Sequence, residues 1–388
     1  MKLNYGKQSI NQDDIKSVVK VLKSDWLTQG PQIDLFERNL NKYLGSKYCC
    51  VVNNGTSALH LAGLSLGWKK NDIIITTPIT FLATSNAIIY NNATPDFVDI
   101  DKNNLTMDLN ILEEKLIKYK KLNKKVKAVI GVDFSGQPCD WINLRFLANK
   151  YSFKLINDNC HALGAEYNGT KKYASKYADI VTQSFHPVKN ITTGEGGAVL
   201  TNDKDLFSRL ANLRSHGMTK DKKKLLHNPG PWYYEMHQLG YNFRITDFQC
   251  ALGINQLKRL DSFINKRRDI ANRYDSAFKN NSDLLTPLKI KNSKHAYHIY
   301  PLQINFEKIN ISKKTFFYKM KKKGINLMVH YLPIISQPFY KKRFNFKEKN
   351  FKNSINFYKK SFSLPMYPGL MKNEVDYVVK NVLENIDN

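Results

Sequence analysis

The chain has 388 residues, 42% of them hydrophobic, which is enough for two packed domains and a large core. Its formal net charge of +27 is typical of proteins that bind nucleic acid or an anionic membrane. The lysines are spread along the whole sequence among many asparagines, however, with no basic arm, aromatic-rich RNA motif or zinc finger. We therefore interpret the charge as a compositional bias that attracts anionic substrates, and we expect no nucleic-acid partner.

The cysteines and the N-terminal residues indicate the cellular compartment in which we expect the protein. The five cysteines form no CxxC pair, so reduced thiols are the simpler expectation. The segment Met1-Lys2-Leu3-Asn4-Tyr5 lacks the apolar core of a signal peptide, and no apolar run is long enough to cross a bilayer. We expect a cytoplasmic protein with no membrane partner.

An anion-binding turn is predicted early in the chain. The run Cys49-Cys50-Val51-Val52 reads as a short buried strand, and residues 53–57 turn from it into a helical pattern. A glycine turn followed by hydroxyl residues presents free N–H groups and side-chain donors to an anion. The simpler alternative is an ordinary helix cap made by Thr56 or Ser57. No GxxxxGK or GxGxxG motif follows a strand, so the common nucleotide-binding folds lack their signature.

Three near-continuous apolar runs, separated by helical stretches, lie at residues 72–77, 94–99 and 127–132. Strands of this kind are buried on both faces, as in parallel sheets whose connections are helices. The pattern predicts an α/β fold with a mostly parallel sheet covered on both sides.

The strongest chemical signal lies in the middle of the chain. The apolar run Phe153-Lys154-Leu155-Ile156 leads to Asp158, and His161 follows three positions later. A β-rich run at residues 178–186 leads to Lys189, and a Gly-rich turn and another apolar run come next. A lysine on a strand-to-strand loop, an acid at a strand end and a flat ring are what a pyridoxal phosphate (PLP) enzyme needs. The lysine holds the cofactor aldehyde as a Schiff base, and the acid keeps the pyridine nitrogen protonated.

The pattern changes after about Ala251. A long basic helical stretch runs through Arg267-Arg268, and shorter strands follow. We expect a large cofactor-binding domain with an N-terminal arm over residues 1–250 and a smaller C-terminal domain over residues 251–388.

Eight segments in sequence order carry a family resemblance: WLTQGP at 26–31, NGTSALHL at 54–61, TPITF at 77–81, DNCHALGA at 158–165, SFHPVK at 184–189, RSHGM at 214–218, GYNFR at 240–244 and VHY at 329–331. Together they resemble the DegT/DnrJ/EryC1/StrS family of sugar aminotransferases, from about Tyr5 to about Pro338. The resemblance implies a fold-type I PLP-dependent transferase, in which a mostly parallel mixed sheet covered by helices is joined to a smaller α+β domain.

The resemblance also implies roles for residues around the cofactor. Lys189 would be the catalytic residue, as Schiff base and proton shuttle, and Asp158 would pair with the pyridine nitrogen. The rings of His161 and Phe81 would lie on opposite faces of the cofactor, and Asn242 would reach it from a neighbouring subunit. The phosphate or the adjacent substrate would be held by Gly55, Thr56 and Ser184.

The substrates are implied in the same way. Positions where related enzymes contact the nucleotide sugar correspond here to Tyr5, Trp26, Leu27, Thr28, Gln29, Met328, Val329, His330 and Tyr331. The implied reaction moves an amino group from L-glutamate to C4 of a UDP-linked 4-keto-6-deoxy-N-acetylhexosamine, as in pseudaminic acid biosynthesis. The active unit would be a homodimer with shared sites, and no metal is expected.

Simpler interpretations exist for the same residues. Any single lysine among sixty Lys and Arg residues is more often a solvated surface charge, and His161 would fit a hydrogen-bonded core position. Phe81 and Trp26 would fit core positions, and Asn242 would fit a turn before a helix. The context of acid, ring and lysine favours the cofactor.

Other functions remain open from the sequence. A relative of the same family would act on another nucleotide 4-keto sugar, of the legionaminic acid, bacillosamine or perosamine type. A sugar dehydratase dependent on PLP or pyridoxamine phosphate (PMP) would share the fold, but in those relatives histidine replaces the Schiff-base lysine, so Lys189 argues against it. A nucleic-acid binder would rest on charge alone.

Overall fold

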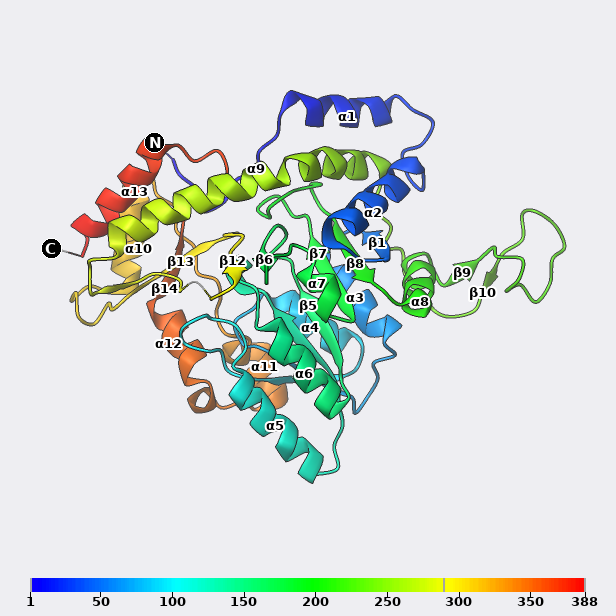
Figure 1. Cartoon of the computed structure of the whole chain (residues 1–388), viewed down its shortest axis with the longest axis horizontal. Helices are drawn as coiled ribbons and strands as arrows, with labels where there is room; N and C mark the ends of the chain where they lie inside the picture. The colour runs from blue at the N-terminus through cyan, green and yellow to red at the C-terminus, as the bar shows by residue number, and fades with distance from the viewer. Residues whose placement is uncertain (1, 289, 387–388) are drawn as a thin grey trace.

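A seven-stranded sheet forms the centre of the computed structural model, which describes residues 2–288 and 290–386 (Figure 1). The strand order is β1-β8-β7-β5-β4-β2-β3. Strand β8 runs antiparallel to its neighbours β7 and β1, and the other pairs are parallel. The strands are β1 (Tyr48–Val52), β2 (Ile73–Thr76), β3 (Thr94–Phe97), β4 (Val126–Val132), β5 (Lys154–Asp158), β7 (Ile180–Ser184) and β8 (Gly197–Thr201). The mostly parallel sheet predicted from the apolar runs is confirmed.

The sheet is covered on both faces because successive strand residues are apolar. In β4, Val129 packs into one buried cluster, whereas Ala128 and Ile130 pack into another. The helices that contribute to the second cluster or pack beside it are α3 (Gly55–Ser65), α4 (Leu82–Tyr90) and α8 (Lys204–Arg214). The opposite cluster includes side chains from α2 (Pro31–Leu44), α5 (Leu109–Lys121), α6 (Trp141–Tyr151), α7 (Tyr173–Tyr177) and α9 (Asp247–Phe278). This layering is that of a fold-type I transferase.

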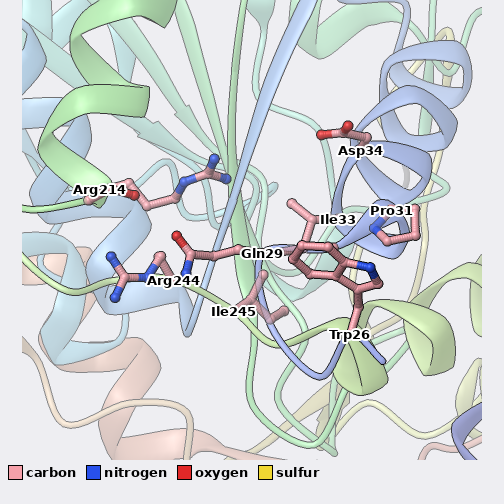
Figure 2. Close-up of a pocket in the computed structure, with 10 residues that line it drawn as sticks. Trp26, Gln29, Pro31, Ile33, Asp34, Arg214, Arg244 and Ile245 are labelled. Atoms are coloured by element: carbon pink, nitrogen blue, oxygen red, sulfur yellow. The ribbon is translucent and has the colours of Figure 1, made fainter. Parts of the chain in front are cut away.

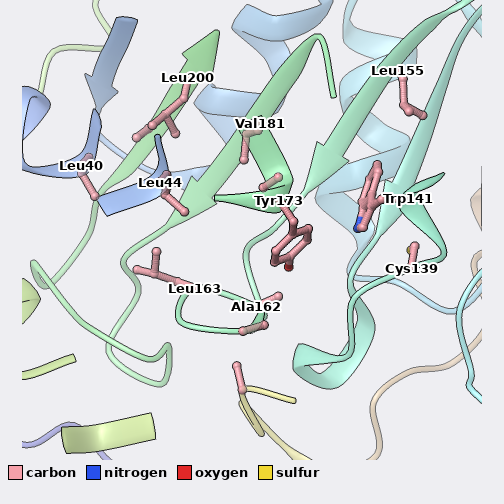
Figure 3. Close-up of a cluster of buried hydrophobic side chains, with 14 of the residues drawn as sticks. Leu40, Leu44, Cys139, Trp141, Leu155, Ala162, Leu163, Tyr173, Val181 and Leu200 are labelled. Atoms are coloured by element: carbon pink, nitrogen blue, oxygen red, sulfur yellow. The ribbon is translucent and has the colours of Figure 1, made fainter. Parts of the chain in front are cut away.

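A buried carboxylate ties the ends of several elements together. Asp133, which follows β4, is fully buried and accepts hydrogen bonds from Trp141 Nε1 (2.9 Å) and Tyr173 Oη (2.7 Å). The backbone N–H of Cys139 (2.8 Å) and Asn159 Nδ2 (2.8 Å) also donate to it. Burial raises the pKa of Asp133 to about 6. Trp141 and Tyr173 stand side by side in the core beneath the sheet (Figure 3).

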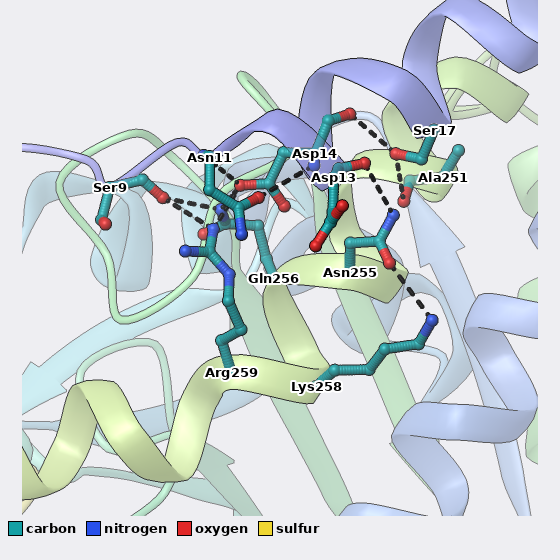
Figure 4. Close-up of polar contacts among 10 residues, drawn as sticks. All are labelled: Ser9, Asn11, Asp13, Asp14, Ser17, Ala251, Asn255, Gln256, Lys258 and Arg259. Carbon is teal, nitrogen blue, oxygen red and sulfur yellow. Dashed lines mark hydrogen bonds and ion pairs between the residues drawn. The ribbon is translucent and has the colours of Figure 1, made fainter.

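The N-terminal helix α1 (Gln12–Leu22) lies along α9, which has 32 residues (Figure 1). Asp14 is buried between them, where it pairs with Arg259 and accepts from Gln256 Nε2 at 2.8 Å (Figure 4). The buried carboxylate is tolerated because the Arg259 guanidinium compensates its charge and Gln256 donates a hydrogen bond to it. At the start of α9, Asp247 accepts hydrogen bonds from two N–H groups at the start of α2. The two helices thereby hold residues 24–31 in place.

The later part of the chain builds a second, three-stranded sheet of order β11-β13-β14. Its strands are β11 (Leu284–Leu285), β13 (Tyr300–Ile304) and β14 (Ser361–Leu364), and the helices of this part are α10 (Lys313–Lys322), α11 (Pro338–Phe344), α12 (Lys352–Lys360) and α13 (Lys372–Glu384). Leu3 forms a bridge to Ile325 here, and the expected boundary between residues 250 and 251 falls inside α9. The two-domain division stays a prediction.

Two short hairpins complete the described structure: β6 (Glu166–Tyr167) with β12 (Ser293–Lys294), and β9 (Met218–Thr219) with β10 (Glu235–Met236). The β9–β10 hairpin projects away from the body of the molecule (Figure 1). None of the helices in the described ranges has the length and apolar character needed to span a membrane.

Candidate active site

The carboxyl ends of the parallel strands meet at one edge of the sheet, where ligands commonly bind in open α/β folds. Asp158 ends β5 and is 5% exposed. Its Oδ2 accepts from Thr84 Oγ1 of α4 at 2.6 Å, and its Oδ1 accepts from the backbone N–H of Cys160 at 3.3 Å. Because Thr84 donates to Asp158, its oxygen accepts from Thr80 at 2.8 Å. The carboxylate is therefore fixed at the floor of this edge.

Lys189 lies on the loop between β7 and β8, as the sequence predicted. Its backbone N–H donates to the carbonyl of His186 at 2.8 Å, which closes a tight turn. Burial lowers the pKa of the Lys189 amine, while the neighbouring Cys160 and Asp158 side chains oppose that effect. The amine can therefore lose its proton more readily than a surface lysine can, which an amine nucleophile requires.

The ring of His161 is buried beside these two groups. Its Nδ1 accepts from the backbone N–H of Ser135 at 3.3 Å, and its Nε2 lies 3.1 Å from the hydroxyl of Tyr331. Burial and the charge of Lys189 lower the pKa of His161 well below its ordinary value, so the ring is neutral. Phe81 is 54% exposed at the start of α4, with its ring 5.9 Å from that of Tyr331. The predicted ring residues thus gather at the site, with Phe81 at its open side.

The start of α3 lies against the end of β7 at the same edge. Asn54 Oδ1 accepts from the N–H of Ser57 at 2.8 Å, so Asn54 caps the helix rather than Thr56 or Ser57. Among the described residues, neither Thr56 nor Ser184 has a hydrogen-bond partner for its hydroxyl. A Cβ on Gly55 would lie 2.7 Å from Ser184 Cβ, so only glycine allows this approach. We call Gly55, Thr56 and Ser184 the phosphate cradle.

Part of the predicted substrate-binding set lies beside His161. The rings of Tyr5 and His330 are 5.1 Å apart, and His330 Nδ1 lies 2.8 Å from Ser363 Oγ. Burial lowers the pKa of His330 to about 3, so it is neutral as well. Met328 is exposed and bridges to Ser363, and Val329 lines a groove next to α10.

The other predicted substrate residues lie in a separate pocket of about 510 Å³ (Figure 2). Trp26 and Gln29 line it together with Arg214 and Arg244. Arg214 is paired with Glu37 at 2.8 Å, whereas Arg244 has no ion pair within the described part of the chain. Leu27 and Thr28 are exposed on the same loop. Thr28 forms a bridge to residue 246, and the carbonyl of Leu27 accepts a hydrogen bond from the backbone N–H of residue 247. None of the predicted cofactor-binding residues lines this pocket.

Asn242, which was predicted to reach the cofactor of a neighbouring subunit, lies near this pocket. It is exposed and its backbone bridges to Ser215. The side-chain amide of Asn242 makes no hydrogen bond within the described residues. Its expected role toward a neighbouring subunit therefore stays a prediction.

Several residues that shape the site were not predicted from the sequence. Thr84 orients Asp158, Ser135 contacts His161, and the ring of His298 packs 4.3 Å from that of His161. A hydroxyl three positions after Phe81, on the same helix, was a usable signal for Thr84. Ser135 and His298 had none, because each is far from His161 in sequence and meets it only through the fold.

The residues present fit PLP. The Lys189 amine with its lowered pKa, the hydrogen-bonded Asp158 carboxylate and the neutral His161 ring lie together. The phosphate cradle offers free hydroxyls and N–H groups at the point where a Cβ on Gly55 would collide with Ser184. Anions bind readily at such helix starts. The phosphate of the cofactor matches the cradle, and its pyridine nitrogen matches Asp158.

Comparison with known proteins agrees with this geometry. The model of the DegT/DnrJ/EryC1/StrS aminotransferase family matches residues 8–383. The chain belongs to this family. It is 42% identical to the UDP-4-amino-4,6-dideoxy-N-acetyl-beta-L-altrosamine transaminase of Campylobacter jejuni, over 97% of this chain and 95% of the relative. The protein is therefore a sugar aminotransferase.

Solved structures of the family share the whole fold. PseC of Helicobacter pylori, described as an aminotransferase involved in the biosynthesis of pseudoaminic acid, superimposes with a TM-score of 0.90 at 34% identity and covers 100% of both chains. The PLP form of the putative sugar aminotransferase Spr1654 of Streptococcus pneumoniae gives a TM-score of 0.87 at 27% identity, over 100% of this chain and 99% of that one. Aminotransferases of this family depend on PLP.

Proposed function

We propose that this sugar aminotransferase binds PLP through Lys189 and transfers an amino group from L-glutamate to C4 of a UDP-linked 4-keto-6-deoxy-N-acetylhexosamine, a step of pseudaminic acid biosynthesis. The observation that carries the proposal is the convergence of Lys189, Asp158 and His161 beside the phosphate cradle. The names of the Campylobacter and Helicobacter relatives support the choice of sugar.

Each residue has a definite task in this reaction. PLP, when bound, supplies an electron sink for the carbon that loses its proton. The Lys189 amine would hold the cofactor covalently and, once released, would carry a proton from the donor carbon and return one at sugar C4. Asp158 would keep a proton on the pyridine nitrogen, and His161 would pack its neutral ring against the cofactor. The phosphate cradle anchors the other end through Thr56, Ser184 and the backbone of Gly55.

We also propose a homodimer with shared sites. The β9–β10 hairpin carries Leu226 and Trp232 at 81% and 71% exposure, and Leu239 just after β10 is 77% exposed. Apolar groups this exposed on a projecting arm are usually covered by another chain. Asn242 follows the arm in sequence, and the pocket of Trp26, Gln29 and Arg244 is also lined by Ser215, which precedes the arm. In a dimer these residues would serve the partner's cofactor and nucleotide sugar.

The substrate assignment is tested by incubating the purified protein with L-glutamate and a panel of 4-keto sugars linked to UDP, dTDP or GDP. NMR of the products locates the new amine and its configuration. We expect amination at C4 of the UDP-linked 6-deoxy-N-acetylhexosamine. Turnover confined to a dTDP or GDP sugar would instead favour a perosamine-type reaction, and loss of a hydroxyl without a gain of nitrogen would identify a dehydratase.

A further inference from the structure

A buried turn fixes one backbone N–H on the edge of the His161 ring. Ser135 follows β4 and has a φ of 58°, a left-handed conformation that is uncommon for a residue with a side chain. Its hydroxyl lies 3.0 Å from His295 Nε2, and its carbonyl accepts from the N–H of Ile299 at 3.4 Å. With its side chain and carbonyl held in this way, the N–H of Ser135 is directed at His161 Nδ1.

This contact determines where the histidine proton lies. A backbone N–H can only donate, so His161 Nδ1 must offer a lone pair and cannot carry hydrogen. The ring is neutral because burial and Lys189 lower its pKa, so its single proton lies on Nε2. Nε2 is 3.1 Å from the hydroxyl oxygen of Tyr331. His161 is therefore the donor in that hydrogen bond and Tyr331 the acceptor.

The hydroxyl proton of Tyr331 is left for another partner. Tyr331 oxygen already accepts from His161, and no acceptor for its own proton occurs among the described residues. Burial, with a contribution from Asp158, raises the pKa of Tyr331, so the hydroxyl stays protonated. The rings of Phe134 and Phe81, 6.4 Å and 5.9 Å away, confine the side chain between the core and the open side of the site.

We propose that Tyr331 is a hydrogen-bond donor to an oxygen of the bound reactants, and that Ser135 and His161 are positioning residues which set the direction of that donor. The inference rests on the proposed aminotransferase function and assigns a task to a residue expected only to contact substrate. Two oxygens have the required chemistry: the ring oxygen of the cofactor and an oxygen of the keto sugar.

The proton arrangement is tested without cofactor or substrate. Apoprotein labelled with ¹⁵N-histidine is compared by NMR with its His161→Gln variant, which identifies the His161 signals. We expect His161 to be neutral, with hydrogen on Nε2 only, from pH 6 to 8, and to keep this form in Tyr331→Phe because Ser135 sets it. A proton on Nδ1, or a doubly protonated ring at pH 7, would overturn the proposal. This result does not depend on whether the enzyme aminates a sugar.

The recipient of the Tyr331 proton is found with Tyr331→Phe. Loss of one such hydrogen bond should weaken binding roughly tenfold. If the recipient is the cofactor, the apoprotein binds PLP about tenfold more weakly; if it is the sugar, PLP binding is unchanged and KM for the nucleotide sugar rises about tenfold. A variant equal to wild type in both measurements refutes the donor role.

A matched pair of variants tests His161 as the positioning residue. His161→Phe keeps a flat ring without a donor, whereas His161→Gln keeps an N–H near the position of Nε2. We expect the Phe variant to show the Tyr331→Phe defect and the Gln variant to recover part of it, with thermal unfolding confirming that both fold. Equal behaviour of the two variants would exclude a role for the histidine proton.

Discussion

Individual residues in the site differ in how the surrounding structure holds them in position. Asp158 is held by Thr84 Oγ1 and the N–H of Cys160, which leaves its remaining lone pairs facing the sheet edge. Lys189 is set by a tight turn, and its amine is shifted toward the neutral form by burial. The pair therefore combines a carboxylate held by two hydrogen bonds with an amine whose pKa is lowered, which suits the proton transfers of transamination.

Asp158→Ala should lower turnover roughly a hundred- to a thousandfold or more, because the ring nitrogen loses the charge that keeps it protonated. The measurement is kcat with saturating glutamate and sugar nucleotide. Asp205→Ala, which removes an exposed carboxylate at the start of α8, is the matched control and should leave kcat unchanged. Near wild-type turnover by Asp158→Ala would mean that the cofactor is oriented differently.

Among the secondary-structure elements, the contact between α3 and β7 and the network around Asp133 shape the site edge. The first places a helix start beside a strand end with no room for a Cβ, and the second joins β4, α6 and α7 through one carboxylate. Both contacts set the relative positions of the ends of β4 and β7. They thereby set the positions of the predicted catalytic groups at this edge of the sheet.

Gly55→Ala should reduce PLP affinity at least tenfold, because its Cβ would meet Ser184 at 2.7 Å and force the helix start away from the cradle. Equilibrium binding of PLP to the apoprotein measures the effect. Gly369→Ala is the control, since nothing lies within 4 Å of a Cβ there. Unchanged affinity in Gly55→Ala would show that the phosphate lies elsewhere.

Asp133 should make stability depend on pH in an unusual direction. Its pKa is raised from 3.8 to about 6, so the folded protein holds this proton more tightly than the unfolded chain does. The bound proton stabilises the fold fully below pH 4. This contribution to the free energy of unfolding, roughly 3 kcal/mol at 1.36 kcal/mol per pH unit, is lost as the pH rises through about 6.

Denaturant unfolding of wild type and Asp133→Asn from pH 4 to pH 7 measures this contribution. The wild type should lose stability relative to the variant across that range, whereas Asp205→Asn should track the wild type. A difference between wild type and Asp133→Asn that does not change with pH would show that the carboxylate titrates normally.

At the scale of the whole molecule, the predicted site residues lie on two separate surfaces. Tyr5, His330 and Tyr331 lie on the surface that includes His161, whereas Trp26, Gln29 and Arg244 line a pocket that shares none of these residues. The arm formed by the β9–β10 hairpin projects from the body, and Ser215 and Arg244, which come before and after it in sequence, both line the second surface. A second copy of the chain, covering the arm, would bring the two surfaces together.

Mixing two inactive variants tests the shared site. Lys189→Ala lacks the essential amine, and Asn242→Ala lacks the residue proposed to reach the partner, so hybrid dimers would contain one site with both intact. We expect activity to return toward a quarter of the wild-type value after subunit exchange, following random pairing. No recovery in mixtures shown to contain hybrid dimers, or full activity in a monomer, would contradict shared sites.

Much of the fold and part of the site could be predicted because their signals are local. The apolar runs at β2, β3 and β4 and the spacing of Asp158, His161 and Lys189 reflect residues that are close in sequence and end on one sheet edge. The alternative of a helix cap made by Thr56 or Ser57 is replaced by a cap at Asn54, because several polar residues in this turn can cap a helix and only the backbone decides which one does.

Other features depend on contacts between distant segments. The Ser135 N–H meets His161 only because residues 295–299 brace its turn, and nothing in the local sequence marks that contact. The separation of Trp26 and Gln29 from the His161 group likewise follows from how the loop before α2 is held by Asp247. Sequence motifs group residues by role, whereas the fold decides which of them share a pocket.

Covalent attachment of the cofactor to Lys189 is the point on which the proposed chemistry depends. Purified protein is loaded with PLP, reduced with borohydride and digested, and the labelled peptide is located by mass spectrometry. We predict a yellow protein with one modified residue per chain, Lys189, and no label in Lys189→Ala. A label on any other lysine, or none after reduction of PLP-loaded protein, would contradict the assignment.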